Sequence, residues 1–113
     1  MISCKNNSIY VNKTDKIIYS EHEIKRLYIE IQGVSYYLYC EPNKKGDKCL
    51  KLDSIPSFYR LETYKGTVLP NNVNKGYYSI LRENDLYIIT NCSLGDAGVC
   101  RISFKTDNNG NLN

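Results

Sequence analysis

Five cysteines are the residues of this 113-residue chain with the clearest capacity for chemistry. Four of them form two close pairs, Cys40 with Cys49 and Cys92 with Cys100, and each pair flanks a polar loop that contains glycine. Cysteines spaced in this way are typical of disulfides that close short loops, and such disulfides persist only in an oxidising compartment. The spacing therefore predicts the disulfides Cys40–Cys49 and Cys92–Cys100 and an exported protein.

Two other interpretations of the same four cysteines are reduced thiols in the cytosol and metal ligands. Other disulfide pairings among the four are also alternatives. Structural zinc sites usually place cysteines about two to four residues apart, so that both reach the ion from one tight turn. The intervening segments 41–48 and 93–99 are too long for that arrangement. We therefore expect no metal ligands and no cofactor.

Cys4 stands apart from the pairs, within Met1-Ile2-Ser3-Cys4. This stretch of four residues resembles the end of a bacterial lipoprotein signal, the lipobox, in which a small residue precedes the cysteine that carries lipid. The resemblance implies a lipidated Cys4, with residues 1–7 as a tether between membrane and domain. It would also account for the odd number of cysteines in an exported protein. A free thiol at Cys4 is the alternative.

His22 is the single histidine and lies between Glu21 and Glu23. A histidine can act as a general base, and Lys25 or Arg26 could steady phosphate charge, as in a small secreted ribonuclease or toxin. Such chemistry normally needs both an acid and a base, and the chain has no second histidine and no G-x-S-x-G motif. We therefore expect a solvated surface histidine and no catalytic residues.

The composition is that of a soluble globular domain. Hydrophobic residues make up 42% of the chain, and there is no run of about 18 apolar residues that could cross a membrane as a helix. The formal net charge of +3 is too small to predict a nucleic-acid partner. With nucleic acid and catalysis set aside, the sequence favours a domain that binds another protein.

Tyrosine is the compositional outlier, with eleven Tyr against two Phe and no Trp. Tyrosine favours strands and is also enriched where proteins bind one another. Tyr37 and Tyr39 alternate with Leu38, so both rings are expected on the face opposite to Leu38, just before the lysine-rich loop 41–48. A solvated loop beside ordinary sheet tyrosines is the alternative. The predicted partner-binding residues are Tyr37, Tyr39, Lys44, Lys45 and Lys48.

Alternation of apolar and polar residues runs through most of the chain and predicts a mainly antiparallel β domain. Leu27–Ile31 and Val34–Cys40 flank Gln32-Gly33, a two-residue hairpin signal. A three-stranded meander is expected over 77–105, from the runs 77–82, 86–92 and 99–105. Further strands are expected at 8–12, 16–19, 49–53, 57–63 and 67–69.

Two patterns compete between residues 20 and 28. Ser20 and Glu23 match a capping box, which predicts a short helix at 21–28, whereas the alternation from Leu27 predicts a strand. The expected fold is therefore a small antiparallel β-sandwich or open barrel, with one short helix as an option. We expect residues 8–106 to form a single domain between the tether and a flexible polar tail at 107–113.

A small β domain that is locked by disulfides and lacks paired catalytic groups is expected to act by presenting a rigid surface. We therefore expect a non-enzymatic inhibitor or immunity protein whose partner is a toxin or an enzyme. It would be periplasmic or anchored to the outer membrane, or otherwise secreted. The alternatives are a secreted ribonuclease built on His22 and a cytosolic immunity protein with reduced cysteines.

Overall fold

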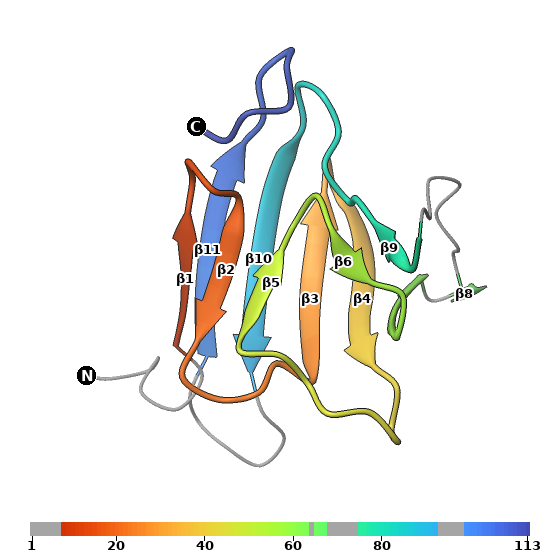
Figure 1. The fold of residues 1–113 in the computed structure, drawn as a ribbon. Helices are drawn as coiled ribbons and strands as arrows, with labels where there is room; N and C mark the ends of the chain where they lie inside the picture. Colours follow the sequence, from red (N-terminus) through yellow and green to blue (C-terminus); the bar gives the residue numbers. More distant parts are fainter. Residues whose placement is uncertain (1–7, 64, 68–74, 93–98) are drawn as a thin grey trace.

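In the computed structural model, which describes residues 8–63, 65–67, 75–92 and 99–113, antiparallel strands form three sheets. The largest has the order β11-β10-β3-β4-β7-β8, a second has the order β1-β2-β5, and β6 pairs with β9. The two smaller sheets lie on one face of the large sheet, so the strands form two layers (Figure 1). This confirms the expected mainly β fold. The strands are β1 Ile9–Asn12, β2 Ile17–Ser20, β3 Arg26–Ile31, β4 Val34–Cys40, β5 Cys49–Lys51, β6 Ile55–Pro56, β7 Tyr59–Thr63, β8 Gly66–Thr67, β9 Tyr77–Tyr78, β10 Leu86–Cys92 and β11 Val99–Lys105.

The hairpin of β3 and β4 at the centre of the large sheet confirms the prediction from Gln32-Gly33. Both turn residues have positive φ angles, 48° at Gln32 and 81° at Gly33, as the tight turns of two-residue hairpins require. The turn sets the register that pairs Leu27 with Leu38. Because successive side chains point to opposite faces, this register buries one apolar row and turns the alternate row outward.

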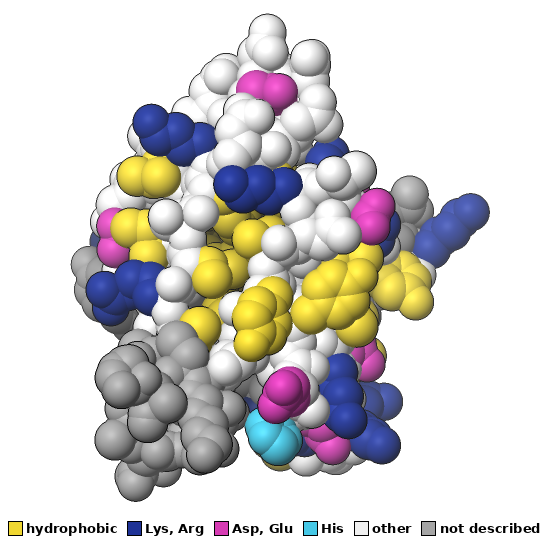
Figure 2. Space-filling model, turned by 90° about the vertical axis from the view of Figure 1, so that its left-hand side faces the viewer, with side chains coloured by type: hydrophobic (Ala, Val, Ile, Leu, Met, Phe, Trp, Pro, Cys, Tyr) yellow, Lys and Arg dark blue, Asp and Glu magenta, His cyan; other side chains and the backbone are white. Residues whose placement is uncertain are grey.

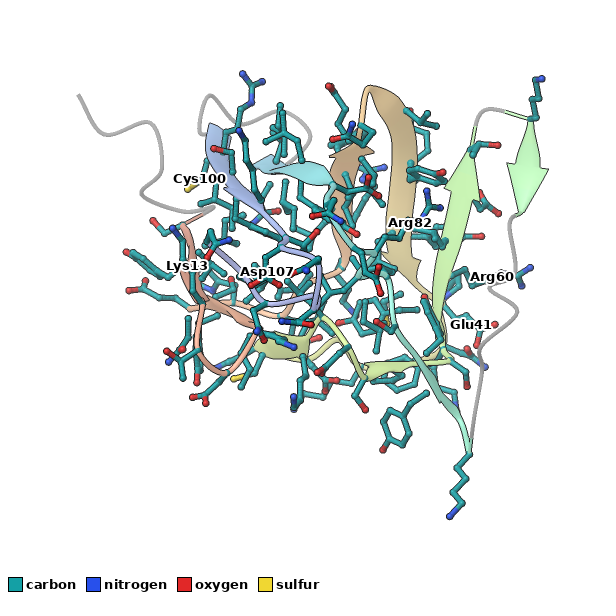
Figure 3. The ribbon with its side chains drawn as sticks, turned by 90° about the horizontal axis from the view of Figure 1, so that it is seen from above. Lys13, Glu41, Arg60, Arg82, Cys100 and Asp107 are labelled. Carbon is teal, nitrogen blue, oxygen red and sulfur yellow. The ribbon has the colours of Figure 1, made fainter. Side chains whose placement is uncertain are left out.

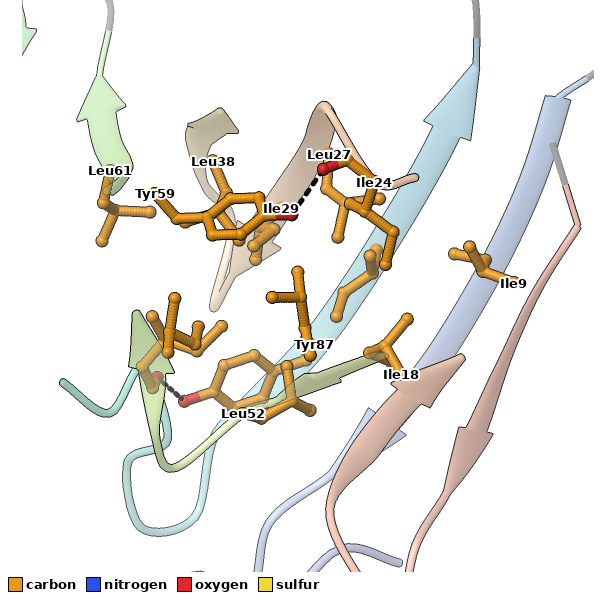
Figure 4. Close-up of a cluster of buried hydrophobic side chains, with 14 of the residues drawn as sticks. Ile9, Ile18, Ile24, Leu27, Ile29, Leu38, Leu52, Tyr59, Leu61 and Tyr87 are labelled. Carbon is orange, nitrogen blue, oxygen red and sulfur yellow. Dashed lines mark hydrogen bonds between the residues drawn. The ribbon is translucent and has the colours of Figure 1, made fainter. Parts of the chain in front are cut away.

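The core fills the space between the two layers (Figure 4). The buried face of the large sheet supplies apolar side chains from β3, β4, β7, β10 and β11, and the small sheets supply the opposing ones. Burial of these side chains is the main source of stability in a domain of this size. The fully buried side chains are Ile9, Ile18, Ile24, Leu27, Ile29, Leu38, Leu50, Leu52, Ile55, Tyr59, Tyr87 and Ile89.

The short helix expected at 21–28 is wrong, and the described part of the chain contains no helix. Residues 21–25 form an irregular connection from β2 to β3, and the alternation that begins at Leu27 belongs to a strand. Glu23 does not close a capping box, since its carboxylate accepts the N–H of Gly46 at 3.0 Å. Tertiary contacts thus outweigh the local helix signal. Accordingly, the described residues hold no helix of the length and apolarity that a membrane span needs.

The expected meander over 77–105 is only partly correct. β10 and β11 pair along their whole length, from Leu86 opposite Lys105 to Cys92 opposite Val99. β9, however, pairs with β6 instead of β10, and β3 takes the other edge of β10. β9, which follows β8 in the chain, therefore belongs to the two-stranded sheet with β6 and not to the large sheet.

Residues 107–113, expected to form a flexible tail, fold back against the end of β11. Thr106 forms a bridge with Leu112, whose side chain is buried, and the backbones of Lys105 and Asn113 bond to each other in both directions. The Asp107 carboxylate accepts the N–H groups of Asn111 and Asn109, and these bonds lower its pKa. The segment is therefore part of the packed domain.

A buried tyrosine joins the two connections that cross between the layers. The Tyr59 hydroxyl donates to the carbonyl of Ile24 at 2.5 Å and accepts the N–H of Asp47 at 2.8 Å (Figure 4). The Ile24 N–H in turn donates to the Asp47 carbonyl at 2.8 Å. The connection 21–25 and the loop 41–48 are thus bonded to each other directly, and the Tyr59 hydroxyl bonds both of them to β7.

Gly46→Ala is expected to destabilise the domain by about 1–3 kcal/mol. A Cβ at this position would lie 2.6 Å from the carbonyl oxygen of Ile24. The positions of the Cβ and of that oxygen are both fixed by the backbone, so no side-chain rotation can separate them. Relief of the clash would require the two connections at Tyr59 to separate. Urea unfolding measures the loss, with Lys45→Ala, an exposed neighbour, expected to stay within about 0.5 kcal/mol. Equal stability of the Gly46→Ala variant and the wild type would refute the tight approach.

Stability is expected to fall as the pH rises above about 10. Burial raises the pKa of Tyr59 and of Tyr87 to about 12, and it raises the pKa of Tyr78 as well. Between about pH 10 and 12 the unfolded chain has lost these protons while the folded protein retains them, so unfolding becomes more favourable. Urea unfolding at a series of pH values measures this, and Tyr87→Phe should reduce the slope. A free energy of unfolding that stays constant over that range would contradict it.

Candidate functional site

The face of the large sheet that points away from the core carries a continuous surface, here called the outer face. It consists of the outward-pointing residues of β3, β4, β7, β10 and β11, and no described strand lies over it. Strand pairing aligns its side chains in rows across the sheet. The central row is Arg101, Thr90, Tyr28, Tyr37 and Glu62, each directly opposite the next.

The tyrosines of the outer face are held by contacts among themselves. Tyr28 and Tyr37 meet edge to face with ring centroids 4.9 Å apart, and the Arg26 guanidinium lies 5.8 Å from the centroid of Tyr28. The Tyr39 hydroxyl donates to the Glu62 carboxylate at 3.0 Å, which raises the pKa of Tyr39. These side chains therefore have restricted rotamer freedom before any partner arrives.

A shallow concavity of about 440 Å³ opens on the outer face beside the tyrosine pair. Arg101 and Glu30 contribute opposite charges to its lining, and Ile88 and the two rings contribute apolar surface. The Nε of Arg101 donates to Thr90 Oγ1 at 3.2 Å, which orients the guanidinium along the central row. The lining residues are Tyr28, Ile29, Glu30, Ser35, Tyr36, Tyr37, Ile88, Thr90 and Arg101.

The structure places the two predicted tyrosines on the face opposite to Leu38, as alternation requires. Tyr37 is 41% exposed, Tyr39 is half-buried, and Leu38 is buried in the core. Tyr28 was not among the predicted residues, although the alternation of Leu27 and Tyr28 contained that signal. Arg101 could not be found in the same way, because its position in the row of Tyr28, across Thr90, depends on the order of the strands in the sheet.

The loop 41–48 begins at the end of β4, next to the outer face, and does not join two strands of one hairpin. It crosses from β4 in the large sheet to β5 in the small one. Glu41 pairs with Arg60 of β7 at 3.7 Å, and the two side chains lie together at one edge of the molecule (Figure 3). The three predicted lysines, Lys44, Lys45 and Lys48, are all exposed.

The predicted Cys40–Cys49 disulfide is not present in the structure, in which both residues are free thiols. Because the intervening loop crosses between layers, the two cysteines belong to different sheets. Cys40 points into the protein, with its sulfur 3.5 Å from the carbonyl oxygen of Lys44, and burial raises the pKa of its thiol. Cys49 is exposed on β5 opposite Tyr19.

The second predicted disulfide, Cys92–Cys100, lies partly outside the described residues. The backbone register places Cys100 opposite Asn91 and Cys92 opposite Val99. Cys100 is buried, and its thiol faces the Ile9 carbonyl with a separation of 3.8 Å. The side chain of Cys92 and all of Cys4 are outside the described part of the chain, within which there is no disulfide.

His22 lies at the surface, where the histidine of the chain appears in cyan (Figure 2). Its backbone N–H donates to Ser20 Oγ at 3.2 Å. The neighbouring Glu23 is already engaged, because the Gly46 N–H and Lys25, at 3.3 Å, bind its carboxylate and lower its pKa. Within the described ranges, no three His, Cys, Asp or Glu side chains gather in a way that could hold a metal ion.

A second aromatic patch lies on the outward side of the small sheet. Tyr10 and Tyr19 stand opposite each other on β1 and β2 and are 59% and 39% exposed. Figure 2, which views the molecule from the side of β1, shows hydrophobic side chains gathered between charged ones. The described residues hold neither tyrosine by a ring contact or a hydrogen bond. This patch is therefore less organised than the outer face.

No family model, no curated protein and no solved structure matches this chain.

The two thiols are expected to differ sharply in reactivity. Cys49 is exposed and should react with a thiol reagent in the native protein, whereas the buried Cys40, with its raised pKa, should react only after unfolding. Alkylation under native and denaturing conditions, followed by peptide mapping without reductant, measures both. A disulfide-linked peptide that contains Cys40 and Cys49 would contradict the structure.

Proposed function

We propose that this domain is a non-enzymatic binding protein of the inhibitor or immunity kind, which contacts a protein partner through the outer face. The observation that supports this most directly is the preorganised cluster of Tyr28, Tyr37 and Tyr39 on a sheet face that no described strand covers. Tyrosine and arginine are the side chains that most often dominate the binding energy of protein interfaces. Both are present on this face, and both are already held in place.

The outer face is a better candidate than the patch of Tyr10 and Tyr19. Ordering a side chain at an interface costs about 0.5–1.5 kcal/mol, and a side chain that is already fixed avoids most of that cost. The edge-to-face contact of Tyr28 with Tyr37 and the bond from Tyr39 to Glu62 provide that fixation. The outer face also has a concavity that could receive a partner side chain.

The exposed lysines of loop 41–48 would act on the approach of the partner. Lys44 and Lys45 lie in the loop that follows β4, Lys48 directly precedes β5, and the chain as a whole has a net charge of +3. Positive charge beside a binding face accelerates association with an acidic partner and contributes less to the final affinity. We therefore propose a toxin or enzyme target whose contact surface is acidic.

The compartment is proposed from the sequence. The lipobox-like Met1-Ile2-Ser3-Cys4 supports a periplasmic protein anchored to the outer membrane through Cys4. The free thiols of Cys40 and Cys49 favour the second candidate, the same binding function in the reducing cytosol. Mass spectrometry of the protein isolated from its own cells separates the two, because a lipidated Cys4 would be found only after export.

Tyr37→Ala is expected to weaken binding to the partner about tenfold or more, mainly through faster dissociation. The exposed ring is at the centre of the proposed contact and can be removed without opening the core. The partner is first captured from cells of the source organism and then purified, and the affinity of the reconstituted pair is measured by calorimetry.

Tyr10→Ala is the matched control for this measurement, since it removes an exposed strand tyrosine from the small sheet. We expect this variant to bind like the wild type. Equal affinities of all three proteins would contradict the proposed face. A loss confined to Tyr10→Ala would move the binding surface to the small sheet.

A further inference from the structure

We propose that the concavity of the outer face receives a carboxylate side chain of the partner, flanked by an aromatic or other apolar group, with Arg101 as its anchor. This inference rests on the proposed function and specifies the chemistry that the partner must present. The concavity brings Arg101 and Thr90 to one side and the ring pair of Tyr28 and Tyr37 to the other.

The guanidinium of Arg101 is both oriented and available. Its Nε is bonded to Thr90 Oγ1, and among the described residues its two terminal nitrogens have no partner. A guanidinium that is fixed through Nε still presents paired N–H groups, which match the two oxygens of a carboxylate. Because the side chain is already oriented, little rotamer entropy remains to be lost on binding.

The charge distribution favours an anion over a cation at this position. The charged side chains on the outer face are Arg26, Arg60, Arg101 and Lys105 on the positive side and Glu30 and Glu62 on the negative side. Glu62 accepts the hydroxyl of Tyr39 outside the concavity, and within the described lining Glu30 is the one acidic side chain and Arg101 the one basic side chain. The balance of the face, like that of the whole chain, is positive.

The apolar part of the lining sets the group that must accompany the carboxylate. Ile88 lies between Glu30 of β3 and Ser103 of β11, one row from Tyr28, so an alkyl side chain and two aromatic rings border the same hollow. An acidic side chain alone would leave the apolar surface of Ile88 and the two rings exposed to water. An acidic residue beside an aromatic one would cover it while its carboxylate reaches Arg101.

The test uses blocked dipeptides as probes and the intact protein labelled with ¹⁵N. At low ionic strength, acetyl-Phe-Asp-amide is expected to shift the amide resonances of Tyr28, Ile88 and Arg101 in a saturable manner. The nearly isosteric acetyl-Phe-Asn-amide should bind about threefold to fivefold more weakly, as the loss of one exposed charge-assisted contact predicts. Added salt should reduce this difference.

Arg101→Gln should remove the preference for the acidic dipeptide. Lys105→Gln is its matched control, because Lys105 lies on the same strand and the same face but outside the concavity, and this variant should keep the preference. Equal binding of the two dipeptides to the wild type would overturn the inference. So would tighter binding of acetyl-Phe-Lys-amide, which would assign the anchoring role to Glu30, or the absence of binding by any probe.

The failure of this inference can be told apart from the failure of the proposed function. If Tyr37→Ala disrupts the reconstituted complex and Arg101→Gln leaves its affinity unchanged, the outer face binds the partner but a carboxylate at Arg101 is not the anchor. If both variants bind normally, the proposed face itself is wrong. A loss of about fivefold or more in Arg101→Gln, with Lys105→Gln unaffected, supports both.

Discussion

The hydroxyl of Tyr59 is the point on which the two layers of this domain depend. The chain crosses between the large and small sheets twice in its first half, at 21–25 and at 41–48, and both crossings bond to this one oxygen. The phenol donates to one backbone carbonyl and accepts from one backbone N–H, so polar groups that would otherwise be buried without partners are satisfied. Tyr78 donates in turn to the carbonyl of Tyr59, which ties the third sheet to the same place.

This junction has a consequence for the opposite side of the large sheet. Once the small sheets are held against one face, every strand of the large sheet must place its apolar row on that side. The alternate row is then left for solvent or for a partner. Tyr28 and Tyr37 are therefore on the outer face because Leu27 and Leu38 are needed in the core. The candidate binding surface is thus positioned by packing on the other side of the sheet.

Local patterns in the sequence were sufficient for most of the strands, though not for β6, and for the central hairpin, since alternation and the Gln32-Gly33 turn act over a few residues. They failed where distant contacts decide. The capping box at Ser20 does not form, because the Glu23 carboxylate accepts the N–H of Gly46 instead. β9 pairs with β6, a strand that the predicted meander did not include. The cysteine spacing suggested loops closed by disulfides, because a loop that crosses between layers can have the same length and composition as a loop that ends a hairpin.

Arg101 and Tyr28 are 73 positions apart in the sequence, so their shared row on the outer face could not be predicted from either segment alone.

The high tyrosine content has two separate physical causes, which the composition cannot distinguish. Tyr59, Tyr78 and Tyr87 are buried, and each hydroxyl donates to a backbone carbonyl outside its own strand. Phenylalanine in these positions would fill the same volume and leave those carbonyls unsatisfied. Tyrosines on the outer face have the opposite arrangement: the ring of Tyr37 is 41% exposed, and the Tyr39 hydroxyl donates to Glu62 on the surface of the sheet. A tyrosine with a buried hydroxyl holds the layers together, and one with an exposed ring can dock a partner. For these tyrosines of β3, β4, β7 and β10, the side of the strand on which each stands decides which role it takes.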